Sequence, residues 1–214
     1  MENEKKAMLL HVAVITGKLM LITTLTALLL ACINRLTEPV ISANEEAKKN
    51  AAVMELFPEA TDIVSLTETA GQTYPEGINE VFAVYKAGML LGHCADAQAM
   101  GFGDYIGMMV GVTTDCRISG IRVLTIAETP GIGMEVAEPD YLAGYEGLAA
   151  PVTFENGPNH ADAISGATYS SRAIRNGVNL VLDFLSALDS TSVPTGEAES
   201  DSSIPTETEE IGNE

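Results

Sequence analysis

One stretch organises the chain: Asp162-Ala163-Ile164-Ser165-Gly166-Ala167-Thr168-Tyr169-Ser170-Ser171. It places small and hydroxyl-bearing residues directly before an amphipathic run at residues 173–188, which predicts a turn that opens a helix. The first N–H groups of a helix have no intrahelical partner and its dipole favours an anion, so this turn could bind a phosphate. Alternatively, Ser170 or Thr168 could be an ordinary helix cap that binds nothing.

A second motif, Glu128-Thr129-Pro130-Gly131-Ile132-Gly133, follows a strongly apolar segment at residues 118–126. Pro130-Gly131 is typical of a type II turn. Glycine-rich loops at strand ends also commonly line ligand sites, because their backbone atoms are accessible. The segment Gly101-Phe102-Gly103-Asp104-Tyr105-Ile106-Gly107 lacks the spacing of a dinucleotide fingerprint and favours a close approach to a ligand or a bulged strand entry.

Apolar runs separated by turn residues predict two strand pairs. Residues 81–87 and 89–97 would turn at Ala87-Gly88, and residues 106–114 and 118–126 around Asp115-Cys116-Arg117. A short helix is expected at residues 141–147 and a closing helix at residues 170–188. The predicted domain, residues 60–188, is therefore α+β, with a twisted, mainly antiparallel sheet and flanking helices.

The N-terminal region is apolar enough to cross a membrane. After a short N-terminus at residues 1–11, residues 12–33 form the expected transmembrane helix; Lys18 would snorkel, face a partner helix or shorten the span. A cleaved signal peptide, or a lipoprotein cleavage site at Leu29-Leu30-Ala31-Cys32, are the alternatives. Residues 34–59 are expected to be a linker helix, in which the helical run extends from Pro39, in its first turn, to Phe57, and Pro58 ends it.

Charge and cysteine content exclude several functions. The net charge of −19 argues against nucleic acid as a partner, since its phosphates would be repelled. Nine of the 30 acidic residues follow Leu182, and residues 189–214 read as a disordered acidic tail that could touch a basic partner. Cys94 could pair with Cys116 or stay a buried free thiol, and no metal-binding spacing of cysteine and histidine occurs.

These features together resemble one family, the FMN-binding domain of the G component of the Rnf electron-transport complex. The resemblance rests on the N-terminal span, the glycine segment from Gly101, the run Ile118-Ser119-Gly120-Ile121-Arg122-Val123-Leu124 and the two motifs described first. It covers nearly the whole chain except the acidic tail. The C component of the sodium-pumping NADH:quinone reductase represents a related family, whose members are generally longer.

The resemblance implies specific roles for the two motifs. In that family Asp-x-x-Ser-Gly-Ala-Thr is the recognition sequence of a flavin transferase, which joins the FMN phosphate to the threonine oxygen as a phosphoester. Thr168 is then the acceptor; Gly166 and Ala167 leave the approach open, and Asp162 and Ser165 are read by the transferase or position the phosphate. Residues 128–133 would lie along the isoalloxazine ring or its ribityl chain.

The function that the resemblance implies is electron relay through covalent FMN, with no catalytic residue of the chain's own. The domain would lie on the outer face of the cytoplasmic membrane, with the amino terminus inside. Its partners would be membrane lipid, the transferase, and the membrane and iron–sulfur subunits of an assembly that couples electron transfer between ferredoxin and NAD to ion movement. There are three alternatives. The chain could be an FMN-binding sensory or regulatory membrane protein, the C component of a sodium-pumping NADH:quinone reductase, or a lipoprotein that binds a small ligand without covalent flavin.

Overall fold

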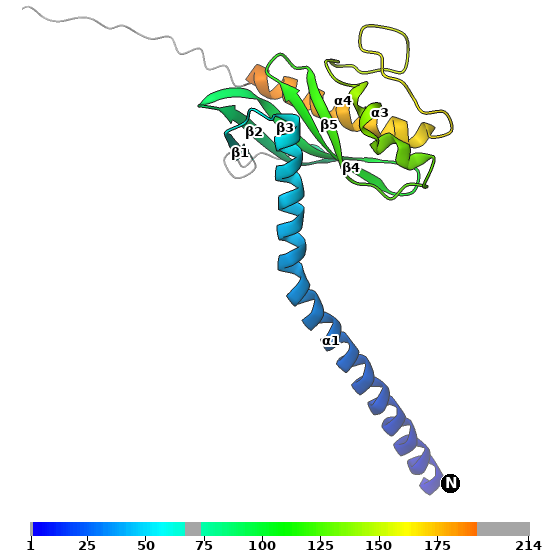
Figure 1. Ribbon diagram of the computed structural model, residues 1–214. Coiled ribbons are helices and arrows are strands. Elements are labelled where there is room, and N and C mark those ends of the chain that lie inside the picture. Colours follow the sequence, from blue (N-terminus) through cyan, green and yellow to red (C-terminus); the bar gives the residue numbers. More distant parts are fainter. Residues whose placement is uncertain (1, 67–73, 192–214) are drawn as a thin grey trace, which may run out of the picture.

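The computed structural model describes residues 2–66 and 74–191, and its centre is an antiparallel sheet. The five strands lie in the order β1-β2-β3-β4-β5, so each strand pairs with its neighbours in sequence. Their bounds are β1 Asp62–Ser65, β2 Ile78–Lys86, β3 Met89–Met100, β4 Tyr105–Thr113 and β5 Ile118–Thr125. Helices lie against both faces of the sheet (Figure 1), which confirms the predicted α+β class.

Two tight turns join the strand pairs that the sequence predicts. Ala87 and Gly88 have φ values of 49° and 81°, the two positive values that a type I′ hairpin turn requires. Cys116, between β4 and β5, also has a positive φ of 56°. The predicted pairs at residues 81–97 and 106–126 are confirmed as β2–β3 and β4–β5. The four-residue strand β1 was not predicted.

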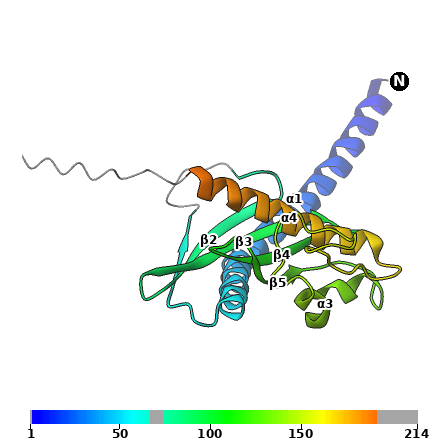
Figure 2. The same cartoon turned by 90° about the horizontal axis from the view of Figure 1, so that it is seen from above.

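Different helices cover the two faces of the sheet. α4 (Thr168–Thr191) lies along one face, and the C-terminal end of α1 (Glu2–Leu56) meets the other, as the two views in Figures 1 and 2 agree. The short helix α3 (Pro139–Ala143) and the 3₁₀ turn η1 (Gly133–Ala137) contribute Leu142 and Val136 to the core beneath α4. Side chains alternate along a strand, so the neighbours Met108 and Met109 enter opposite cores.

α1 is one continuous helix, although the sequence indicated a membrane span followed by a separate linker helix. Pro39 lies inside α1 and does not open a second helix. Figure 1 shows α1 changing direction along its length, and an interior proline, which removes one backbone hydrogen bond, is the usual cause of such a bend. Within the described residues, the segment Ala13–Leu56 of α1 is the one helix long and apolar enough to cross a membrane.

The last residues of the α1 region pack closely against three glycines of the sheet. Gly92, Gly111 and Gly120 come from β3, β4 and β5. A Cβ atom at Gly120 would lie 2.8 Å from Leu56 Cδ2, and one at Gly111 would lie 3.2 Å from Phe57 Cε2. The sheet can approach the helix this closely only because these positions lack side chains.

Ion pairs fasten the same end of α1 to the sheet. Lys49 Nζ lies 2.8 Å from Asp96 Oδ2 and 3.1 Å from Glu80 Oε2, and the side chain of Asp96 is only 7% exposed. Arg122 Nε on β5 lies 2.6 Å from Glu55 Oε2. Together with the apolar contacts, these ion pairs make the end of α1 and the sheet one packed unit. The helix therefore holds the sheet in a defined position relative to its own axis.

Replacing Gly92 by alanine is expected to destabilise this packed unit by about 2 kcal/mol, the usual cost of overpacking. The added Cβ would lie 2.2 Å from the carbonyl oxygen of Val112 and 3.0 Å from Phe57 Cζ, and the backbone oxygen cannot move aside cheaply. Denaturant unfolding of the full-length protein in detergent measures the change. Gly157→Ala is the control, because its nearest neighbour would be 4.0 Å away. Equal stabilities of the two variants would contradict the close packing.

Candidate functional site

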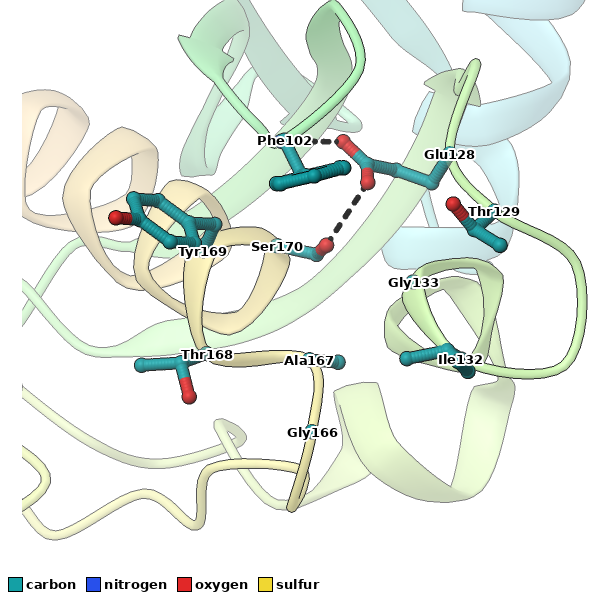
Figure 3. A pocket seen from close by; sticks show the side chains of 10 residues that line it. All are labelled: Phe102, Glu128, Thr129, Ile132, Gly133, Gly166, Ala167, Thr168, Tyr169 and Ser170. Carbon is teal, nitrogen blue, oxygen red and sulfur yellow. Dashed lines mark hydrogen bonds between the residues drawn. The ribbon is translucent and has the colours of Figure 1, made fainter.

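A cavity of about 390 Å³ opens where the N-terminus of α4 meets the loops after β3 and β5 (Figure 3). This volume is in the range of small-molecule sites, about 300–1,000 Å³. Three segments that are distant in sequence line it: Phe102; Glu128, Thr129, Ile132 and Gly133; and Gly166, Ala167, Thr168, Tyr169 and Ser170. The two motifs singled out in the sequence thus face each other across one cavity.

The turn before α4 is held by its own hydrogen bonds. Gly166 has a φ of 85°, which favours glycine, and the next amide, of Ala167, donates to the carbonyl of Ile164 at 3.0 Å. The amide of Ile164 donates to Ser171 Oγ at 3.1 Å. Ser171, which is fully buried, therefore anchors the turn, while Thr168 begins the helix and is exposed.

Glu128 connects two of the segments that line the cavity. Its Oε1 accepts hydrogen bonds from the amides of Phe102 at 2.7 Å and Gly103 at 3.2 Å, and its Oε2 accepts one from Ser170 Oγ at 3.0 Å. The residue is only 7% exposed. The carboxylate thus ties the loop after β3 to the first turn of α4, as the dashed lines in Figure 3 show.

Glycines make room for this carboxylate. A Cβ at Gly101 would lie 2.1 Å from Glu128 Oε1, and one at Gly133 would lie 2.7 Å from Glu128 Oε2. The spacing of Glu128 and Gly133 within one motif therefore has a structural explanation. The loop folds back so that Gly133 packs against the side chain of Glu128. Both carboxylate oxygens of Glu128 have protein partners in this structure, namely the two amides of the loop after β3 and the hydroxyl of Ser170.

The rim of the cavity is apolar and open. Phe102 and Tyr169 are 68% and 62% exposed, and their ring centroids are 6.0 Å apart with an angle of 52° between the planes. Ile132 lies on another side of the cavity from these two rings, and its side chain faces Ala167 (Figure 3). Exposed aromatic and aliphatic side chains around a cavity offer flat, apolar contact area, which suits a planar ring system.

The structure brings most of the predicted site residues together. Pro130, Gly131, Ser165 and Asp162 are exposed and do not line the cavity. The Asp162 side chain is 94% exposed and accepts a hydrogen bond of 3.2 Å from His160 Nε2. Its exposure leaves it accessible to a second protein.

Three lining residues were missed in the sequence: Phe102, Tyr169 and Ser170. The flanking glycines of Phe102 indicated a close approach to a ligand, but they did not indicate which ligand or where. Ser170 was considered only as a helix cap, and it instead donates to Glu128 from inside the helix. Within the described residues, no group of three or more His, Cys, Asp or Glu side chains could hold a metal ion.

Comparison with known proteins agrees with this geometry. The FMN-binding domain family matches residues 101–183, which span all three segments of the cavity. The G component of the ion-translocating oxidoreductase complex from Stutzerimonas stutzeri is 30% identical over 174 residues, covering 77% of this chain and 76% of that protein. The protein of the same name from Methanosarcina acetivorans is 27% identical over 175 residues, covering 79% of this chain and 92% of that protein.

The name of a third relative also states the ion and the electron carriers of its complex. The G component of the Na(+)-translocating ferredoxin:NAD(+) oxidoreductase complex from Acetobacterium woodii is 28% identical over 145 residues, covering 64% of this chain and 70% of that protein. The matches extend well beyond the cavity, and all three relatives are the same component of their complexes. The chain belongs to the family of G components of the ion-translocating oxidoreductase (Rnf) complexes, and it contains an FMN-binding domain.

Proposed function

We propose that this protein is a membrane-anchored electron carrier with FMN attached to Thr168 as a phosphoester. One observation carries the proposal: an exposed threonine at the start of α4 stands at the mouth of a 390 Å³ cavity whose rim is aromatic and apolar. The helix N-terminus suits the phosphate, and Phe102 and Ile132 offer contact area to the ring system. The residues present therefore fit FMN.

Attachment needs an activated flavin nucleotide and a separate transferase. The bond from Thr168 Oγ1 to phosphorus forms as a phosphoanhydride bond of the flavin nucleotide breaks, so a nucleotide leaves and the hydroxyl proton is lost. No side chain in the described part of the chain hydrogen-bonds the Thr168 hydroxyl, and activation of that hydroxyl is therefore assigned to the transferase. The exposure of Thr168, Ser165 and Asp162 supports recognition by a second protein.

The bound flavin would supply the redox chemistry, and the chain would supply position and tether. α1 fits the tether, because its apolar side chains from Leu19 to Ile41 are exposed along the helix. A soluble helix would bury such a surface, whereas a membrane covers it. Electrons would pass between neighbouring subunits of an assembly that couples ferredoxin and NAD to ion translocation, as the name of the Acetobacterium woodii relative suggests.

Peptide mass spectrometry of the protein purified from its native host tests the central claim. We expect flavin fluorescence to survive denaturing electrophoresis, and the mass of FMN to map to Thr168. Native material is needed because a foreign host can lack the transferase. An unmodified Thr168 in that material would overturn the proposed attachment. If the mass of FMN maps to another residue, that residue is the attachment point and Thr168 is not.

The proposed orientation, with the domain on the outer face, predicts a pattern of cysteine labelling. A membrane-impermeant maleimide should label Cys116, which is partly exposed, in right-side-out vesicles. Cys94 should react only after denaturation, because burial raises its pKa to about 12 and leaves almost no thiolate at pH 7 to 8. Labelling of Cys116 only in inverted or permeabilised vesicles would place the domain inside.

A further inference from the structure

The start of α4 has an unusual distribution of charge for this chain. The protein has 30 acidic residues against 11 basic ones, yet the first turn of α4 contains no aspartate or glutamate. Acidic side chains are favoured at that position, because the helix dipole is positive there. One turn further on stands Arg172, a cation close to the end of the helix that disfavours cations.

Arg172 lies on the same face of α4 as Thr168. Residues four apart are neighbours on a helix surface, and long helical side chains lean toward the helix N-terminus. The guanidinium of Arg172 can therefore reach over the turn that carries the Thr168 hydroxyl. Both residues are exposed, so nothing in the packed core restricts this approach.

Arg172 also differs from the other arginines of the folded domain. Within the described residues it has neither an ion pair nor a hydrogen bond from its side chain. The others are engaged: Arg117 with Asp115, Arg122 with Glu55, and Arg175 over the ring of Phe154 at 4.6 Å. Among the described residues this cation has no anionic partner, so its guanidinium is available to bind an anion other than a described side chain.

We propose that Arg172 binds the phosphoryl group carried on Thr168, an inference that rests on the proposed attachment of FMN. A phosphodiester keeps one negative charge, and the planar guanidinium can donate two parallel hydrogen bonds to its oxygens. Arg172 thereby neutralises the phosphate end of the cofactor and fixes its direction from the helix. Phe102, Ile132 and Tyr169 contact the ring end, and Arg172 distinguishes a phosphorylated flavin from an unphosphorylated one.

Comparing FMN with riboflavin tests this without the transferase. In full-length Thr168→Ala protein, which cannot form the phosphoester, fluorescence titration gives the Kd of each flavin. Adding Arg172→Gln should weaken FMN binding about tenfold, because the exposed guanidinium and its hydrogen bonds to the phosphate are lost, and leave riboflavin binding unchanged. Arg117→Gln, which also removes one positive charge, should change neither Kd. Equal affinity for the two flavins before the change, or equal losses after it, would overturn the role of Arg172.

The loaded protein gives a second readout. In flavinylated protein, the ³¹P resonance of the phosphodiester should shift in Arg172→Gln and move back toward its wild-type position in Arg172→Lys. A wild-type resonance in loaded Arg172→Gln would overturn the contact. If wild-type Thr168 never carries FMN, the proposed function fails, and the contact between Arg172 and an esterified phosphate fails with it. A loss of affinity for FMN but not for riboflavin in the titration would still identify Arg172 as a phosphate-binding residue.

Discussion

Thr168→Ala is expected to abolish covalent flavin and leave the fold intact. The substitution removes the hydroxyl that would form the phosphoester. Thr168 is exposed and its hydroxyl has no hydrogen-bond partner among the described residues, so the free energy of unfolding should change by no more than about 0.5 kcal/mol. Flavin fluorescence after denaturing electrophoresis should fall to background in cells that contain the transferase.

Thr129→Ala is the matched control for that experiment. Thr129 is also an exposed threonine that lines the cavity, so its loss changes the pocket wall without removing the acceptor. It should keep covalent flavin at the wild-type level. Fluorescence that persists in Thr168→Ala, or that disappears equally in Thr129→Ala, would show that Thr168 is not the specific attachment point.

Much of the sheet could be predicted because each hairpin is encoded locally. Alternating and continuous apolar runs define β2 to β5, and residues such as Ala87-Gly88 mark the turns between them. β1 has only four residues, with every second one partly buried, too few for a period to stand out. The continuity of α1 through Pro39 was also missed, because helix-forming residues on both sides outweighed one lost hydrogen bond.

The site was predictable where its chemistry lies in one motif and not where it depends on tertiary contacts. The turn at Gly166 and the position of Thr168 at the start of a helix follow from adjacent residues. By contrast, the place of Phe102 at the cavity involves a contact between distant residues, since its amide donates to Glu128, which is 26 residues further along the chain. No sequence period marks such a contact, and the hydrogen bonds from the carboxylate of Glu128 to two backbone amides and Ser170 were therefore not predicted.

Glu128→Ala should have the largest effect on stability, because this carboxylate links the loop after β3 to α4. The change removes three hydrogen bonds and leaves two backbone amides and the Ser170 hydroxyl without their acceptor. We expect a loss of about 3 kcal/mol in the free energy of unfolding, measured with denaturant on the full-length protein in detergent. Glu135→Ala, at an exposed glutamate of the neighbouring turn, should change it by less than about 0.5 kcal/mol.

Glu128→Gln separates the role of hydrogen bonding from that of charge. The glutamine oxygen can still accept from the amides of Phe102 and Gly103, and its NH₂ group can donate to Ser170 Oγ, whose hydroxyl proton can rotate away. The network would survive without its negative charge, at a cost of about 1 kcal/mol. If Glu128 instead acted directly on the flavin, glutamine would alter the visible spectrum of the loaded protein as strongly as alanine does. If it is a positioning residue, only alanine should release Phe102 and shift that spectrum.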